Sequence, residues 1–325
     1  MPPALVQAGD EAGIARASAL IRQGEMVAIP TETVYGLAGD ATNDRAVARI
    51  YEAKARPRFN PLIVHVLDRN SAATHAIFSE NAGRLAEKFW PGPLTLVLQR
   101  RADCRISLLA SAGLDTIAVR APAHPVARAV LQKCGLPLAA PSANPAGRLS
   151  PTEAAHVASM LGDKVAMILD GGPCRYGIES TVVDVSGDEP VLLRTGAIAT
   201  DEIEACLGRR LVAPGSGPAR SPGMQLRHYA PRIPIHMDAD RVAPSEALLA
   251  FGPTPLPGAA ATLNLSPSGD TTEAAANLFA MLHRLDDPRF TAIAVMPVPA
   301  HGLGVAIRDR LRRATQAGDD AQRAD

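Results

Sequence analysis

The sequence has 325 residues, of which 47% are hydrophobic and only 3% aromatic, and its 33 basic residues balance its 33 acidic ones. This length favours two domains, while the neutral balance excludes a global electrostatic attraction to nucleic acid or anionic lipid. The few rings argue against a stacking platform for single-stranded RNA, and no apolar run approaches the roughly 20 residues of a membrane helix, so we expect a soluble protein without membrane contact.

The start of the chain and its cysteines indicate the compartment. Residues 1–10 contain prolines and an acid but no cationic segment followed by an apolar run, so no secretory signal is visible. Cys104, Cys134, Cys174 and Cys206 are widely spaced without a CxxC pair, and the histidines show no HxxxH or HxH spacing. We therefore expect a cytoplasmic location, reduced thiols and no dedicated metal site.

Apolar, β-rich runs alternate with helical patterns through the first two thirds of the chain, which is typical of an α/β fold. The predicted strands are Met26–Ile29, Leu62–Val66, Leu94–Leu98, Ile117–Val119, Val165–Leu169, Thr181–Val185 and Val191–Leu193. Helices are predicted after Asn43 as far as Pro57, from Ser150 to Leu161 and from Thr200 to Gly208. The first places Lys54 at a helix end, and the second depends on a capping box, Ser150–Glu153.

From Ala213 to Pro234 the composition shifts to Gly, Pro, Ser and Arg without apolar periodicity, which is typical of a linker. Beyond it the α/β pattern resumes. The predicted elements are strands Ile233–Met237, Ala261–Leu265 and Ala292–Val295 and helices Thr272–Leu285 and Leu303–Ala314. They predict a small second domain, and the polar residues 316–325 are expected to fray.

The common glycine-rich phosphate loops, GxxxxGK[ST] and GxGxxG, are missing. Instead, the segment Lys54–Pro61 carries three cations pinned by two prolines between a helix end and a strand. Proline rigidity lowers the entropic cost of presenting these charges together, and arginine forks with a lysine point charge suit a triphosphate. A solvated loop after a helix whose dipole favours cations explains the same residues, so both interpretations stay open.

Two further loops could hold a small ligand. Pro30–Leu37 follows a buried-looking strand, where α/β folds place binding loops, and its hydroxyls could hold an amino acid. Pro141–Pro145 presents short polar groups between two prolines. Ordinary turn hydrogen bonds explain both loops equally well.

Single polar residues in or beside the strands are ambiguous for a similar reason. His65 lies inside a strand, where a histidine with its hydrogen bonds satisfied by the core is the more common situation. Arg120 and Arg194 each end an apolar strand. An arginine at this position can be an ordinary exposed residue of the strand end or a ligand for an anion. Ser180 has no GxSxG motif around it, so hydrolysis by a serine nucleophile is weakly supported.

Taken together, these segments resemble the YrdC-domain family in its long form with a C-terminal extension, whose members make threonylcarbamoyl-AMP. The resemblance runs from about Gly9 to Ala314. It rests on PTETVYGL at 30–37, KARPRFNPLIVHV at 54–66, FWPGPLTLVL at 89–98, TIAVRAP at 116–122, APSANPAG at 140–147, ESTVVD at 179–184 and LLRTGAI at 192–198, and in the extension on SPGMQLRHYAP at 221–231 and GLGVAIRDRLRRA at 302–314. Motifs in this order along one chain are far more specific than any single one.

The resemblance implies roles for individual residues. Catalysis is expected at Lys54 and Arg56. ATP is expected at Lys54, Arg56, Asn60, Thr116, Ser142, Asn144, Ser150, Arg194 and Tyr229. Threonine is expected at Thr33, Tyr35, His65, Arg120, Ala140 and Ser180. The segment Ser221–Pro231 is expected to act as a lid that brings Tyr229 onto the nucleotide.

The chain departs from the family pattern at four positions. Glu32 stands where Asp is usual, Ala55 where Gly is usual, Gln225 where Lys is usual and Arg308 where Asn is usual. Gln225 lacks the charge that the family supplies there.

The resemblance also implies a fold: a YrdC-like twisted mixed α/β sheet with helices and a concave basic cleft over residues 1–210, a linker or lid over 211–232, and a small Rossmann-like α/β domain over 233–325. The implied reaction forms a carbamate on the threonine amine from bicarbonate, and the carbamate oxygen then attacks the α-phosphate of ATP with loss of pyrophosphate. Mg²⁺ on the phosphates, transfer of the product to a tRNA-modifying complex and a weak tRNA contact are further expectations.

Two other functions are compatible with the same residues. Related YrdC-like domains serve other carbamoyl chemistry, so a different carbamoyl- or ATP-handling enzyme is the first alternative. A double-stranded RNA or tRNA-binding protein is the second. Threonine-dependent release of pyrophosphate separates the first, whereas salt-sensitive RNA binding without ATP turnover favours the second.

Overall fold

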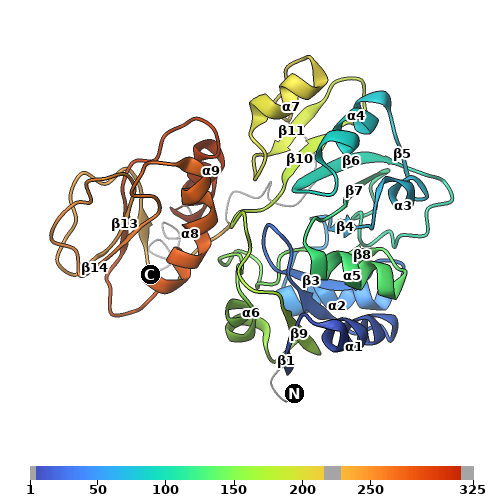
Figure 1. Cartoon of the computed structure of the whole chain (residues 1–325), viewed down its shortest axis with the longest axis horizontal. Helices are drawn as coiled ribbons and strands as arrows, with labels where there is room; N and C mark the ends of the chain where they lie inside the picture. The colour runs from blue at the N-terminus through green and yellow to red at the C-terminus, as the bar shows by residue number, and fades with distance from the viewer. Residues whose placement is uncertain (1–4, 216–227, 316–325) are drawn as a thin grey trace. The chain divides into compact units, whose positions relative to one another are not determined.

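The computed structural model of the chain describes residues 5–215 and 228–315, which form two compact units (Figure 1). The first unit contains the described residues up to 146, residues 151–174 and residues 179–215. The second contains residues 147–150, 175–178 and 228–315. The linker that composition predicts lies partly outside the described residues, so the predicted boundaries at 210 and 232 stay predictions.

A mixed sheet of 11 strands forms the first unit, in the order β1-β9-β2-β3-β8-β4-β7-β6-β10-β11, with β5 paired to β6. The strands are β1 (Leu5–Ala8), β2 (Val27–Ile29), β3 (Gly36–Asp40), β4 (Ile63–His65), β5 (Ala76–Ile77), β6 (Leu94–Arg100), β7 (Thr116–Arg120), β8 (Leu138–Ala139), β9 (Met167–Asp170), β10 (Thr181–Asp184) and β11 (Val191–Arg194). The sheet contains both parallel pairs, such as β4 with β7, and antiparallel pairs, such as β6 with β7, which confirms the mixed α/β sheet that the resemblance implies.

Helices cover both faces of this sheet. They are α1 (Glu11–Arg22), α2 (Asp44–Lys54), α3 (Arg69–Ala73), α4 (Glu80–Phe89), α5 (Pro125–Cys134), α6 (Ala154–Leu161) and α7 (Thr200–Leu207). Val27 and Ile29 of β2 pack with α1 and α5, which contact each other, whereas Ala28 between them packs with α2 and α6 on the other face. This alternation is what a strand buried on both faces requires.

The helix that ends at Lys54 shows how the sequence positions the cationic loop. Asn43 caps α2 by accepting hydrogen bonds from the main-chain N–H groups of Arg45 and Ala46. After Lys54 the chain turns through Ala55 at φ 49°, in the left-handed region that glycine adopts most easily. The prediction that Lys54 ends a helix is confirmed, and the geometry explains why glycine is usual at the next position.

The capping box predicted at Ser150–Glu153 is wrong. Helix α6 begins only at Ala154, and Glu153 at its start makes no capping hydrogen bond with its side chain. The main chain before the helix makes other hydrogen bonds. The carbonyl of Pro151 accepts from the N–H of Tyr35, and the carbonyl of Thr152 accepts from the N–H of Cys174. The helix nevertheless reaches Leu161 as predicted.

A separate sheet of four strands, all paired in parallel in the order β12-β15-β13-β14, forms the second unit. Its elements are β12 (Ile235–His236), β13 (Ala247–Ala250), β14 (Ala261–Asn264), α8 (Thr271–Leu285), β15 (Ile293–Val295) and α9 (Gly304–Thr315). The expected small α/β domain is confirmed. In the described ranges, no helix combines the length and the apolar character needed to cross a membrane.

Candidate functional site

The end of β7 brings together the first group of predicted site residues. Strands β4 and β7 are parallel and in register, so His65 lies beside Arg120. The Arg120 guanidinium is buried and donates from Nη1 to the hydroxyl of Thr33 at 2.9 Å and from Nε to the carbonyl of Gly92 at 3.2 Å. Thr33 comes from the loop after β2, so Thr33, His65 and Arg120 form one cluster.

Glu32, the residue before Thr33, completes the coordination of Arg120. Its Oε1 lies 2.5 Å from Arg120 Nη2, and its Oε2 accepts from the main-chain N–H groups of Ala123 at 3.0 Å and His124 at 3.2 Å. Burial opposes the charged carboxylate, but Arg120 and these N–H groups hold the pKa of Glu32 below its usual value. In the sequence, Glu32 is marked only as a departure from the family pattern, and this role was not predicted.

His65 is neutral in this setting. Burial, and secondly the positive charge of Arg120, lower the pKa of His65 to about 3. Its Nδ1 is buried and has no hydrogen-bond partner among the described residues. A buried nitrogen of this kind is available to a ligand, so the interpretation of His65 as a core histidine with its hydrogen bonds satisfied does not fit the structure.

Neighbouring strands β6, β10 and β11 bring together a second group. Val182 of β10 lies opposite both Thr95 of β6 and Arg194 of β11, and Ser180 is the residue before β10. Arg194 donates to Ser180 twice, from Nε to the carbonyl at 3.1 Å and from Nη2 to Oγ at 3.0 Å. The hydroxyls of Thr95 and Ser180 lie 2.8 Å apart, and sequence reasoning missed Thr95.

Gly196 lets the loop after Arg194 lie directly against the chain at Ser180. A Cβ on Gly196 would lie 2.4 Å from the carbonyl carbon of Ser180 and 2.4 Å from the main-chain nitrogen of Thr181. No side chain fits at that distance from backbone. The glycine in LLRTGAI therefore fixes Arg194 against Ser180.

The cationic loop forms a third group. Lys54 is buried and donates from Nζ to the carbonyl oxygens of Ser142, at 2.5 Å, and Asn144. Arg56 is also buried and donates from Nε to the carbonyl of Asn60 at 3.0 Å and from Nη2 to that of Pro61 at 2.9 Å. The solvated-loop interpretation of Lys54 and Arg56 therefore does not fit, although Arg58 in the same loop is exposed.

Burial and the neighbouring Arg56 lower the pKa of Lys54 well below its usual value, against a smaller opposing effect of Glu179. A buried ammonium that carbonyl dipoles hold in place is poised to gain an anionic partner. The Oδ1 of Asn60 is likewise buried and has no hydrogen-bond partner in the described part of the chain. Thr116 begins β7 close to this loop, because Ala118 pairs with Ile63, two residues after Pro61.

Two residues expected at the threonine position have mainly structural contacts. Tyr35 is buried, and its hydroxyl donates to the carbonyl of Gly172 at 2.8 Å and lies 3.2 Å from Asp170 Oδ1. Burial is the largest cause that raises the pKa of Tyr35, which keeps it neutral. Ala140 follows β8 and donates its main-chain N–H to the carbonyl of Ile63, so it lies between the loop at Ser142 and β4.

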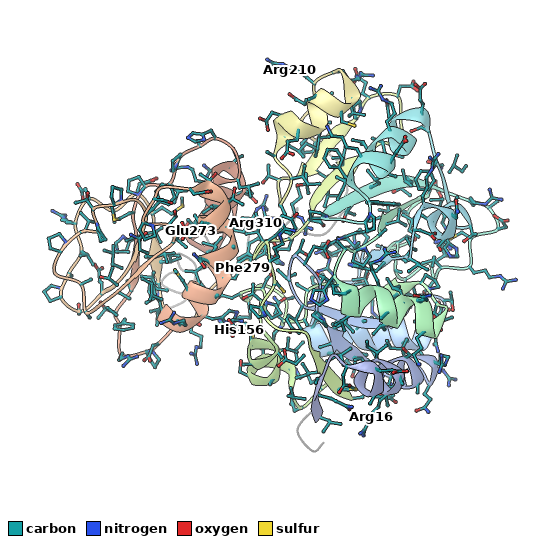
Figure 2. The ribbon with its side chains drawn as sticks, viewed as in Figure 1. Arg16, His156, Arg210, Glu273, Phe279 and Arg310 are labelled. Atoms are coloured by element: carbon teal, nitrogen blue, oxygen red, sulfur yellow. The ribbon has the colours of Figure 1, made fainter. Side chains whose placement is uncertain are left out.

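The remaining two, Ser150 and Tyr229, belong to the second unit. Ser150 is buried, and its carbonyl accepts from Nε2 of His283 at 3.1 Å. Tyr229 is buried at φ 67°, with its ring centroid 5.4 Å from that of Phe279 and 5.5 Å from the guanidinium of Arg310; Figure 2 labels these two neighbours on α8 and α9. Their approach to ATP stays a prediction, and so does the lid, because residues 221–227 lie outside the described ranges.

A cavity of about 300 Å³ elsewhere in the first unit is lined by residues that include Val66, His75, Leu131 and Pro137. It contains none of the residues expected to bind ATP or threonine. Among the described residues, no group of three or more His, Cys, Asp or Glu side chains could hold a metal ion.

Comparison with known proteins identifies the family. A family model described as "Telomere recombination", of the Sua5/YciO/YrdC type, matches residues 19–196, and one described as "Threonylcarbamoyl-AMP synthase, C-terminal domain" matches residues 198–316. The threonylcarbamoyl-AMP synthase of Bacillus subtilis is 40% identical over 320 residues, covering 93% of this chain and 92% of its own. The chain belongs to the threonylcarbamoyl-AMP synthase family.

Solved structures agree with this membership. The crystal structure of Pyrococcus abyssi Sua5 complexed with L-threonine is similar at a TM-score of 0.87 and 37% identity, covering 97% of both chains. The structure of Escherichia coli YciO is similar in fold to part of the chain, at a TM-score of 0.54 and 24% identity over 60% of this chain. As a member of this family, the protein is an enzyme, and the B. subtilis and P. abyssi relatives extend over both of its units.

Proposed function

We propose that this enzyme makes threonylcarbamoyl-AMP and pyrophosphate from L-threonine, bicarbonate and ATP. The main support is that the cluster of Thr33, His65 and Arg120 is buried, holds a cation whose partner is Glu32, and contains a neutral imidazole with a free nitrogen. Such a cluster suits a small zwitterion with an additional hydroxyl. The P. abyssi relative, whose structure is titled as a complex with L-threonine, supports the same assignment.

The threonine carboxylate would bind Arg120. The guanidinium carries five N–H groups, and its bonds to Gly92, Thr33 and Glu32 use one on each nitrogen. One N–H therefore remains on each terminal nitrogen, which is what a bidentate carboxylate needs. The hydroxyl of threonine would then lie among Thr33, His65 and Ser180.

ATP would bind at the cationic loop and at Arg194. Lys54 and Arg56 are held by main-chain carbonyls, so their positions are set before the phosphates arrive and little entropy is lost on binding. Ser142 and Asn144 belong to the loop that Lys54 holds, and Thr116 begins the neighbouring strand. We include Ser150 and Tyr229 of the second unit in this site, with the lid closing over it.

Magnesium would arrive with ATP. The residues assigned to ATP are cations, hydroxyls and amides, so a magnesium ion would take most of its ligands from phosphate oxygens and water. When bound, the ion would neutralise phosphate charge. The protein's own contribution is to orient the two substrates and to stabilise developing negative charge with Lys54 and Arg56, as phosphoryl-transfer sites generally do.

The proposed chemistry has two steps. The uncharged amine of threonine condenses with bicarbonate, with loss of water, to give a carbamate. A carbamate oxygen then attacks the α-phosphorus of ATP while pyrophosphate leaves. Excluding water would protect the mixed anhydride that forms. We propose that the product passes, in the cytoplasm, to a complex that modifies tRNA, and that any direct tRNA contact is weak because the chain has no net charge.

The test is mass spectrometry of the product after mixing the protein with ATP, Mg²⁺, bicarbonate and threonine. We expect threonylcarbamoyl-AMP, together with pyrophosphate release that requires threonine. Release of pyrophosphate or phosphate that does not depend on threonine would instead indicate a different carbamoyl- or ATP-handling enzyme. Salt-sensitive tRNA binding without ATP turnover would indicate an RNA-binding protein.

A further inference from the structure

Thr95 is a buried polar residue in the otherwise apolar run Leu94–Leu98 of β6, and the proposed mechanism gives it no role. We propose that Thr95 is a positioning residue that fixes the hydroxyl of Ser180 as a hydrogen-bond donor toward an oxygen atom of the amino-acid substrate. This inference rests on the proposed function, because it takes from it the placement of Ser180 against threonine.

The geometry isolates the two hydroxyls from water. Thr95 and Ser180 are both fully buried, at 0% exposure, and their oxygens lie 2.8 Å apart. Parallel pairing of β6 and β10 places Thr95 opposite Val182, so the contact is set by strand register rather than by a mobile loop. Gly196 packs against the main chain of Ser180 and so also fixes the position of that residue.

The acceptor capacity of Ser180 decides which way its own proton points. A serine hydroxyl has two lone pairs and one O–H. Arg194 Nη2 donates to Ser180 Oγ at 3.0 Å and has no lone pair to offer in return, so it fills one of them. If Thr95 donates as well, both lone pairs are filled and Ser180 can interact with a ligand only by donating.

A substrate acceptor beside Ser180 selects that direction. Among the residues that the structure describes, Thr95 Oγ1 has no hydrogen-bond partner other than Ser180 Oγ. Whichever hydroxyl donates across this contact, the other O–H is buried without an acceptor among the described residues, which is unfavourable. A substrate oxygen at the proposed threonine position can accept from Ser180, and this removes the unsatisfied O–H only if Thr95 is the donor. Thr95 therefore donates to Ser180, and the Ser180 O–H points away from both Thr95 and Arg194.

The consequence is a statement about the substrate atom. A hydroxyl restricted to donation selects an acceptor, such as a carboxylate, hydroxyl or carbamate oxygen, and disfavours an ammonium group, which has only protons to offer. Ser180 would then bind threonine through one of its oxygens and leave the amine free to react. Thr95 controls this selectivity without touching the substrate.

The experiment compares Thr95→Val with Thr95→Ser in the intact chain. Valine keeps the shape of threonine but removes the donor, whereas serine keeps the donor. We expect Thr95→Val to raise the KM for threonine about three- to tenfold and to change the KM for ATP less than about twofold, while Thr95→Ser stays close to the parent. Ser180→Ala should raise the threonine KM at least as much, and adding Thr95→Val to it should have no further effect.

The outcomes separate the inference from the proposed function. An unchanged threonine KM in Ser180→Ala would contradict the placement of Ser180 and thus the proposed site. A changed KM in Ser180→Ala with no change in Thr95→Val would overturn the role of Thr95 alone, as would equal effects on the KM values of threonine and ATP. If Thr95→Val does not fold, Thr95→Ala is measured in its place against the same criteria, with thermal unfolding of each variant as the check on folding.

Discussion

Two buried cations in the first unit, Arg120 and Lys54, have hydrogen-bond acceptors of different kinds. Arg120 is paired with a carboxylate, Glu32, at 2.5 Å. Lys54 donates to the main-chain carbonyl oxygens of Ser142 and Asn144. A carboxylate cancels a positive charge, whereas a carbonyl dipole only holds it in place.

The difference matches the charges of the two proposed ligands. Threonine is a zwitterion, and the cluster around Arg120 is already close to neutral before it binds. ATP carries several negative charges, which Lys54 and Arg56 of the loop would face in the proposed complex. The lowered pKa of Lys54, caused by burial and then by Arg56, is the expected result of holding a cation in this way. Variants at Arg120 and in the cationic loop should therefore change different quantities: the first should change stability and the use of threonine, and the second should change ATP affinity.

The largest effect is expected for Arg120→Met, which leaves Glu32 buried without its partner. Breaking a buried ion pair from one side costs about 3–5 kcal/mol, so the free energy of unfolding should fall by that amount and threonine-dependent activity should be lost. Urea denaturation followed by circular dichroism measures the first quantity. Arg49→Met is the matched control, because its pair with Glu25 is 38% and 34% exposed and should contribute less than about 1 kcal/mol. Equal losses in the two variants would contradict the importance of the buried pair.

A smaller effect is expected for Arg56→Ala and Lys54→Met. Each removes a charge held for the phosphates, and a lost charge-assisted contact is worth about 1.5–3 kcal/mol, or one to two decades in ATP affinity. Isothermal titration calorimetry with ATP measures it, and the threonine KM should change much less. Arg58→Ala, in the same loop but exposed, is the control and should leave ATP affinity near that of the parent. Unchanged ATP affinity in Arg56→Ala would show that the loop does not hold the nucleotide.

The smallest effect is the pH dependence contributed by His65. Its pKa is lowered to about 3, so the native state stays neutral while the unfolded chain takes up a proton below about pH 6.5. Stability therefore falls as the pH drops, by about 1.4 kcal/mol per pH unit, or about 2 kcal/mol between pH 6.5 and 5. His65→Gln should lose less stability than the parent over this range, whereas the exposed His301→Gln should behave as the parent does. Identical slopes for the parent and His65→Gln would contradict a buried, neutral imidazole.

Local patterns in the sequence were enough to predict much of the fold. Helix α2 ends at Lys54 as predicted, because a cap and a proline mark its ends, and the apolar runs of β4 and β7 became strands. Strand β3 was not predicted, since its Gly36 and Gly39 weaken the strand signal. Both glycines are there for packing: a Cβ would lie 3.3 Å from Ala140 Cβ and 3.2 Å from Ile50 Cδ1, respectively.

The residues that support the site could not be predicted in the same way. Glu32 and Thr95 act on Arg120 and Ser180, which lie 88 and 85 positions further along the chain, and such pairing depends on sheet register. A signal existed for Thr95, since it is a polar residue inside the apolar run Leu94–Leu98. The resemblance supplied the residues expected to touch substrate, but not the ones that hold them in position.

The paired hydrogen bonds from Arg194 to Ser180 have one more consequence. Arg194 is assigned to ATP and Ser180 to threonine, yet they share a side-chain bond of 3.0 Å and a main-chain bond of 3.1 Å. Whichever substrate arrives first would immobilise a group that belongs to the binding surface of the other. The two affinities are then linked, and thermodynamic reciprocity requires that threonine strengthen ATP binding by the same factor as ATP strengthens threonine binding.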